Sequence, residues 1–75
     1  MMKMVPVVSS NIESIGHDPE TNTMHVKFKD KGTSVGKTYV HDNFPASEHA
    51  RFIGADSPGS HYHQFIKGKY AARPL

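Results

Sequence analysis

The clearest pattern in the chain is the alternation of apolar and polar residues over residues 24–29. Met24, Val26 and Phe28 fall on one face of an extended segment, and the polar residues between them fall on the other. A period of two residues is typical of an antiparallel strand that is buried on one side only. The pattern therefore predicts a strand whose apolar face contacts the core.

Two further strands are predicted on either side of this one, over residues 12–17 and residues 37–42. The first connection, residues 18–22, reads Asp-Pro-Glu-Thr-Asn, a typical turn composition. The second, residues 30–36, contains two glycines and is also predicted to turn. Short connections of this kind join neighbouring antiparallel strands.

The N-terminal residues 1–8 are predicted to be an extended segment that precedes a single domain over residues 9–73. Pro6 lacks a backbone N–H, so it argues against a helix and against a central strand at this point.

Two helices are predicted after the strands, over residues 45–55 and residues 58–67. Pro45 suits the start of the first helix, and Ser57 followed by Pro58 is a typical N-cap and first helical position. The order of elements is strand, strand, strand, helix, helix, which indicates an α+β domain. We expect a three-stranded antiparallel meander with both helices packed on one face.

An apolar stripe on the second helix consists of Tyr62, Phe65 and Ile66, at positions i, i+3 and i+4. This spacing places three side chains on one face of an α-helix, and in so small a domain that face is expected to cover the sheet. Replacing Phe65 by alanine should then cost about 3–5 kcal/mol of stability.

The composition limits what kind of protein this is. With 75 residues, of which 36% are hydrophobic, the chain makes one domain with a small core that depends on its aromatic side chains. The absence of cysteine fits a reducing compartment, and no apolar run is long enough to span a membrane. We expect a cytoplasmic protein without a membrane partner.

No catalytic or metal site is expected from the sequence. His17 and His41 each precede an aspartate, but neighbours in a strand point to opposite faces, so neither pair resembles a catalytic triad. His61 and His63 are two positions apart and do not share a helix face as metal ligands would. We therefore expect a protein that is not an enzyme and that needs no cofactor.

A series of short segments runs through the chain in a specific order and spacing. They are Ser9-Ser10-Asn11-Ile12, Ile15-Gly16-His17-Asp18, Met24-His25-Val26-Lys27-Phe28, Tyr39, Phe44-Pro45, Ala55-Asp56-Ser57-Pro58-Gly59, Tyr62-His63 and Ile66-Lys67-Gly68-Lys69-Tyr70. Together these segments, over roughly residues 7–73, resemble the KTSC domain. That domain ends some lysyl-tRNA synthetases and also occurs as small separate proteins of bacteria and their phages. The resemblance implies a fold and, for some relatives, a context near tRNA, but no catalytic residues.

Three positions depart from the family pattern. An aromatic residue is usual where His17 and His41 stand, and arginine is frequent where Lys67 stands. The histidines make the sheet more polar, and the lysine keeps the charge without the planar guanidinium that can hold a phosphate at two points.

The charge distribution suggests a surface for an anionic partner. The net charge is only +2, but the chain from His61 to its end carries basic residues and no acid. We predict a non-catalytic module that binds nucleic acid, RNA or tRNA rather than DNA. The candidate binding residues are Lys67, Lys69, Tyr70, Arg73, Lys27, Lys29 and His63.

A protein-interaction or adaptor module, encoded by a phage or prophage, is the alternative. A small sheet has edges that can recruit a protein partner or a second copy of the chain.

Overall fold

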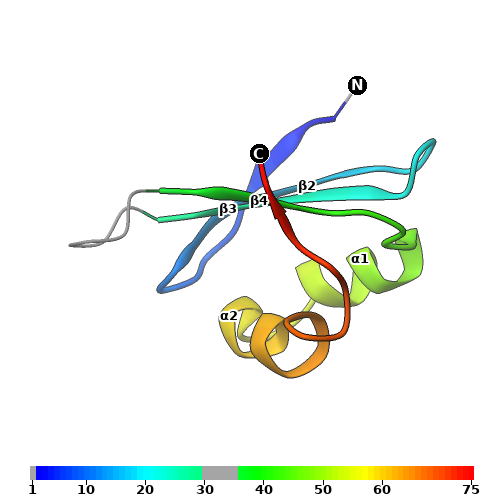
Figure 1. Ribbon diagram of the computed structural model, residues 1–75. Helices are drawn as coiled ribbons and strands as arrows, with labels where there is room; N and C mark the ends of the chain where they lie inside the picture. Colours follow the sequence, from blue (N-terminus) through cyan, green and yellow to red (C-terminus); the bar gives the residue numbers. More distant parts are fainter. Residues whose placement is uncertain (1, 30–35) are drawn as a thin grey trace.

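An antiparallel sheet and two helical segments make up the computed structural model, which describes residues 2–29 and 36–75. The strands are β1 Met4–Pro6, β2 Ile12–Asp18, β3 Thr23–Phe28, β4 Thr38–His41 and β5 Arg73–Pro74, and they lie in that order across the sheet. The helices are α1 Ala46–Ile53 and α2 Pro58–His61, and α2 continues directly into the π-helical turn η1 Tyr62–Ile66. Both helices lie on the same face of the sheet (Figure 1).

The α+β class, the antiparallel sheet and the two helices are confirmed, but the number of strands is not three. The described part of the chain forms a five-stranded sheet, because β1 and β5 extend the predicted three strands at the two edges. These edge strands are three and two residues long, and each contains a proline. Proline is tolerated at a sheet edge because the missing N–H is not needed by a neighbouring strand.

The first predicted turn connects β2 to β3. Asn22 has a φ of 55°, a left-handed conformation that asparagine adopts more readily than most residues. The carbonyl of Asn22 accepts a 2.7 Å hydrogen bond from the backbone N–H of Phe44, which joins this turn to the segment that leads into α1. Residues 30–35, which contain most of the second predicted turn, lie outside the described part.

The core lies between the sheet and the helices. In the sheet, Ile15 pairs with Val26 and Val26 pairs with Tyr39, so these three side chains share the face that the helices cover. Opposite them lie Phe44 and Phe52, both fully buried. The predicted division of β3 into an apolar and a polar face is therefore confirmed.

The predicted stripe on the second helix is wrong at one position. Tyr62 and Ile66 are buried, at 7% and 1% exposure, but Phe65 is 50% exposed and lies against His61. The reason is the wide turn of η1, in which the N–H of Lys67 bonds to the carbonyl of Tyr62, five residues back, at 2.8 Å. A π-helical turn holds more residues than an α-helical one, so position i+3 no longer shares the face of position i.

The start of α2 has the predicted position but a different hydrogen bond. Ser57 is the N-cap residue and Pro58 the first helical residue, yet the Ser57 hydroxyl bonds to that of Ser60 rather than to a backbone N–H. Gly59 packs closely against the loop before β2, because a Cβ atom there would lie 2.5 Å from Oδ1 of Asn11. No helix among the described residues has the length and apolar character needed to cross a membrane.

Candidate functional site

A groove of about 330 Å³ opens between the sheet and the helical layer. This volume lies at the lower end of the range of about 300–1,000 Å³ that is usual for small-ligand sites. Its lining residues come from β3, β4, η1 and the segment that leads to β5: Phe28, Tyr39, Tyr62, His63, Lys67 and Ala72.

Three aromatic rings form the apolar part of the groove. The ring of Phe28 meets that of Tyr39 edge to face at 5.8 Å and that of Tyr62 at 5.3 Å. Phe28 and Tyr39 are only half-buried, whereas Tyr62 is buried. The partly exposed rings offer a surface on which a planar group can stack.

The rim of the groove is basic. His63 and Lys67 are both exposed, and the six described lining residues include no acid. An apolar aromatic floor beside an ammonium group suits a ligand that joins a planar ring to a negative charge.

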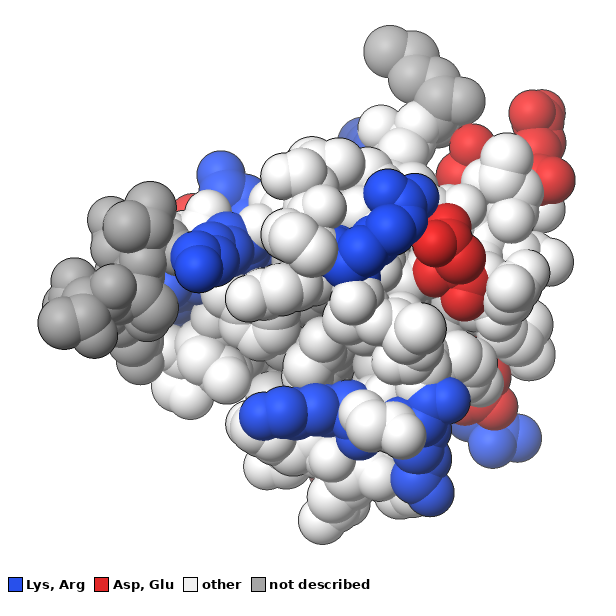
Figure 2. All heavy atoms as spheres, in the orientation of Figure 1, with Lys and Arg blue, Asp and Glu red and all other residues white. Residues whose placement is uncertain are grey.

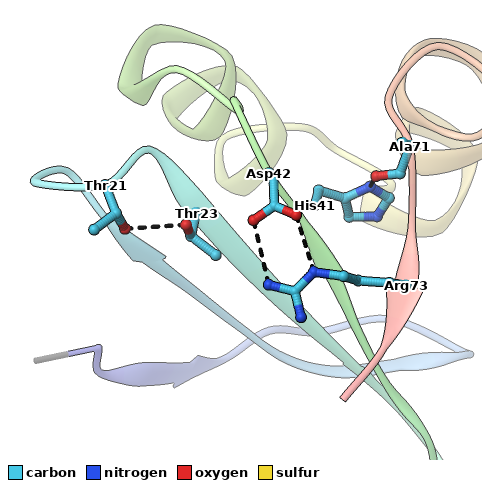
Figure 3. Close-up of polar contacts among 6 residues, drawn as sticks. All are labelled: Thr21, Thr23, His41, Asp42, Ala71 and Arg73. Atoms are coloured by element: carbon cyan, nitrogen blue, oxygen red, sulfur yellow. Dashed lines mark hydrogen bonds and ion pairs between the residues drawn. The ribbon is translucent and has the colours of Figure 1, made fainter.

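His41 is fully buried next to Tyr62, a lining residue of the groove, and makes two hydrogen bonds that fix its tautomer. Nδ1 lies 3.1 Å from the carbonyl oxygen of Ala71, which can only accept, so Nδ1 carries the proton (Figure 3). Nε2 therefore accepts from the Tyr62 hydroxyl, at 2.9 Å. Burial lowers the pKa of His41, so the imidazole is neutral, and burial raises the pKa of Tyr62, so the phenol keeps its proton.

The C-terminal basic residues predicted for binding separate into two places. Lys67 lines the groove, and Lys69 is exposed on the turn that follows, where Gly68 has a φ of 83°. Arg73 instead forms an ion pair with Asp42, with Nε 2.9 Å from Oδ2 (Figure 3). Figure 2 shows the basic side chains of one face in two groups, one over the sheet and one across the helical layer, with uncharged surface between them.

The other predicted binding residues do not reach the groove. Lys27 pairs with Glu13 at 3.1 Å, and the ammonium group of Lys29 donates to the carbonyl of Ser9 at 2.6 Å. The ring of Tyr70 packs edge to face on Phe44 at 4.7 Å. Of the predicted set, only His63 and Lys67 line the groove, and Lys69 is their close neighbour in the chain.

Sequence reasoning assigned Phe28 and Tyr62 to the core alone and did not find the role of His41. Phe28 and Tyr62 are core residues whose rings also line the groove. The alternation of side chains along β4 could have predicted that His41 is buried. It puts His41 on the same face as Tyr39, and this face packs against the helices.

The remaining histidines do not form a metal centre in the described ranges, which contain no group of three or more potential ligands. His17 donates from Nε2 to the carbonyl of Phe44 at 2.6 Å, and its ring stacks on that of His49 at 4.8 Å. This pair connects β2 to α1, and we interpret it as a structural contact.

Known proteins resemble this chain both in sequence and in structure. The model of the KTSC domain family matches residues 8–70. The structure superimposes on the crystal structure of a KTSC domain protein from Yersinia pestis with a TM-score of 0.88, at 35% identity, over 100% of this chain and 99% of that one. A protein of Stutzerimonas stutzeri (strain A1501), described as uncharacterised, is 33% identical over 69 residues, which are 92% of this chain and 90% of that protein.

Proposed function

The chain belongs to the KTSC domain family, and we propose that it is a non-catalytic module that binds single-stranded nucleic acid, with RNA preferred. The groove between Phe28, Tyr39 and Tyr62, with Lys67 at its rim, is the observation that supports this proposal. The resemblance to a domain found at the end of some lysyl-tRNA synthetases favours RNA over DNA.

The proposed mode of binding has two parts. A base stacks on one of the half-buried rings of Phe28 and Tyr39 and meets the other edge to face, because the two rings are nearly perpendicular. Stacking on an aromatic ring contributes about 1–3 kcal/mol per base in single-strand-binding proteins. Lys67 neutralises the phosphate beside that base, and Lys69 binds the next phosphate of the RNA. A base inside a duplex cannot enter such a groove without leaving its stack, so the preferred partner is a single strand or a loop.

The alternative, a protein-interaction module that recruits a strand at the sheet edge, has less support. The edge strands β1 and β5 are short and contain Pro6 and Pro74, which interrupt the row of donors that an added strand would need. The groove, by contrast, carries charge as well as apolar surface.

The test is fluorescence anisotropy with a labelled single-stranded RNA at several salt concentrations. Lys67→Gln and Lys69→Gln should each weaken binding and reduce the slope of log K against log salt by roughly 0.7, the value for one phosphate on a single strand. Lys27→Gln is the matched control, because Lys27 lies on the opposite face of the sheet and is paired with Glu13.

Two results would remove the proposal. One is the absence of binding at low salt, where electrostatic attraction is strongest. The other is a loss of RNA affinity in the Lys27→Gln control as large as the loss in Lys67→Gln. That result would show that net charge and not the groove governs binding.

A further inference from the structure

His41 connects the segments that form the walls of the groove. It lies in β4 on the same face as Tyr39, it accepts a hydrogen bond from Tyr62 of η1, and it donates one to Ala71. Ala71 immediately precedes Ala72, which lines the groove. One buried side chain therefore holds the sheet wall, the helical wall and the C-terminal wall together.

In the folded protein a neutral imidazole makes both hydrogen bonds. A proton taken up at Nε2 would reverse the bond to the Tyr62 hydroxyl, which would then accept, and would place a positive charge where His41 is fully buried. Because burial disfavours that charge, protonation favours arrangements in which Tyr62 and the segment at Ala71 move away and water reaches the imidazole. Tyr62 contributes its ring to the groove and meets Phe28 edge to face, so its displacement changes the surface that a ligand meets. A change of charge at His41 is thereby transmitted to the aromatic floor.

We propose that His41 is a positioning residue of the groove, whose neutral form holds Tyr62 and residues 71–72 in the arrangement that accepts a ligand and whose protonation releases them. The identity of the ligand rests on the proposed function. The coupling between His41 and the groove walls does not, because it can be measured without ligand.

The groups around His41 determine how readily it protonates. The backbone carbonyls of Ala71 and Tyr70 favour the charged form, as does Asp42, the residue after β4, although the Asp42 carboxylate is also engaged by Arg73 from β5. The neighbour from β3 is the apolar Met24, and η1 contributes the neutral Tyr62. Burial outweighs the influence of Asp42, so the pKa of His41 lies below its usual value.

His63 at the rim is a second histidine beside the proposed ligand, and its contribution must be kept apart from that of His41. The pH experiments are therefore made with His63→Gln as the background. In this background, a loss of affinity in acid can be assigned to the buried His41 and not to the exposed His63.

The first measurement uses the protein without ligand. Nitrogen chemical shifts of the imidazoles, followed by NMR between about pH 7.5 and pH 5, report tautomer and charge at each histidine. We expect His41 to carry its proton on Nδ1 at neutral pH, and the signals of Tyr62 and Ala72 to move together with its titration. Titration of His41 while both signals stay fixed would overturn the proposal.

The second measurement is affinity for a single-stranded RNA of about six nucleotides over the same pH range. Affinity should fall by up to about tenfold per pH unit below the folded-state pKa of His41, the limit for one linked proton. His41→Gln retains an acceptor for Tyr62 and cannot titrate, so it should bind at neutral pH and lose the pH dependence. His41→Phe should bind several-fold more weakly at every pH.

A variant at His25, on the opposite face of the sheet, is the control, and His25→Gln should keep the pH profile of the background. An affinity and a pH profile in His41→Phe that equal those of the His63→Gln background would overturn the proposal. If RNA does not bind at any pH, the proposed function fails, and the ligand-free NMR measurement alone decides the role of His41.

Discussion

Arg73 and Asp42 form a two-point ion pair, with Nε 2.9 Å from Oδ2 and Nη2 3.3 Å from Oδ1 (Figure 3). The pair connects β5 to the end of β4. His41, the neighbour of Asp42, reaches Ala71 on the other side of the strand. The C-terminal segment is therefore held to β4 from both faces.

Replacing Arg73 by glutamine should loosen β5 locally while leaving the domain folded, because the pair is solvent-exposed and the strand is two residues long. We expect faster hydrogen exchange at the Leu75 amide, which bonds to the carbonyl of Thr38 at 2.9 Å, with little change in Tm. Arg51→Gln, which removes the exposed pair of Arg51 with Glu48, is the matched control and should leave that amide unchanged.

Acid should have the same local effect in the unmodified protein. The hydrogen bond from Arg73 lowers the pKa of Asp42 below its usual 3.8, so the attachment is present above about pH 4 and is lost as the pH falls through the lowered pKa. Exchange at Leu75 that is equally fast at neutral pH and at low pH, after correction for intrinsic rates, would contradict this attachment.

Phe52→Ala and Phe65→Ala should differ sharply in stability. Phe52 is fully buried, so its truncation should cost about 3–5 kcal/mol, close to the whole stability of a small domain. Phe65 is 50% exposed and contacts His61, so its truncation should cost about 1 kcal/mol or less. Urea unfolding curves measure both, and a larger loss for Phe65 would mean that η1 faces the sheet as an ordinary α-helix would.

Patterns in the sequence predicted the parts of the fold whose signal is local. The alternation over residues 24–29, the turn ending at Asn22 and the Ser57-Pro58 helix start depend on neighbouring residues, and the structure has all three at the expected places. The edge strands depend instead on pairing with distant segments, and the wide turn accompanies the packing of Tyr62 and Ile66 in the core. Strands of three and two residues that contain proline carry no periodic signal of their own.

The candidate site was predictable only in part, because much of it depends on contacts between segments that lie far apart in the chain. The sequence indicated basic residues near the C-terminus, and Lys67 and His63 do line the groove. It could not show that Arg73 and Lys27 are engaged by acids that lie far away in the chain. Nor could it show that a buried histidine connects the walls, because that depends on the packing of η1 against β4.

Stability should fall on mild acidification. Burial lowers the pKa of His41 and of His49, and the neighbouring His17 lowers that of His49 further. Below about pH 6.5 the unfolded chain binds protons that the folded chain does not, so stability is lost as the pH falls through that value toward the lowered folded-state pKa values.

Thermal unfolding at a series of pH values measures this dependence. His49→Gln should flatten the decline of Tm between about pH 7.5 and pH 5, because one of the two linked protons is removed. His25→Gln, on the other face of the sheet, should leave the decline in place. A Tm that is constant or rises in acid would show that burial does not govern these histidines.

Gly59→Ala should destabilise the domain by about 1–3 kcal/mol, since the new Cβ would lie 2.5 Å from Oδ1 of Asn11, an atom held by a hydrogen bond from Ser9. Shortening Asn11 to alanine removes the obstacle. The double variant should therefore lose less stability than the sum of the losses in the two single variants. Urea unfolding of the four proteins measures the coupling, and additive losses would mean that α2 does not rest on this loop.

An NMR titration of the isotope-labelled protein with a single-stranded RNA determines whether the aromatic groove is the surface that binds it. We predict that the largest chemical-shift changes fall on the groove residues Phe28, Tyr39, His63, Lys67 and Ala72. The opposite face of the sheet, represented by Gly16 and His25, should change little. Saturable shifts confined to that opposite face, or no shifts at low salt, would contradict the claim.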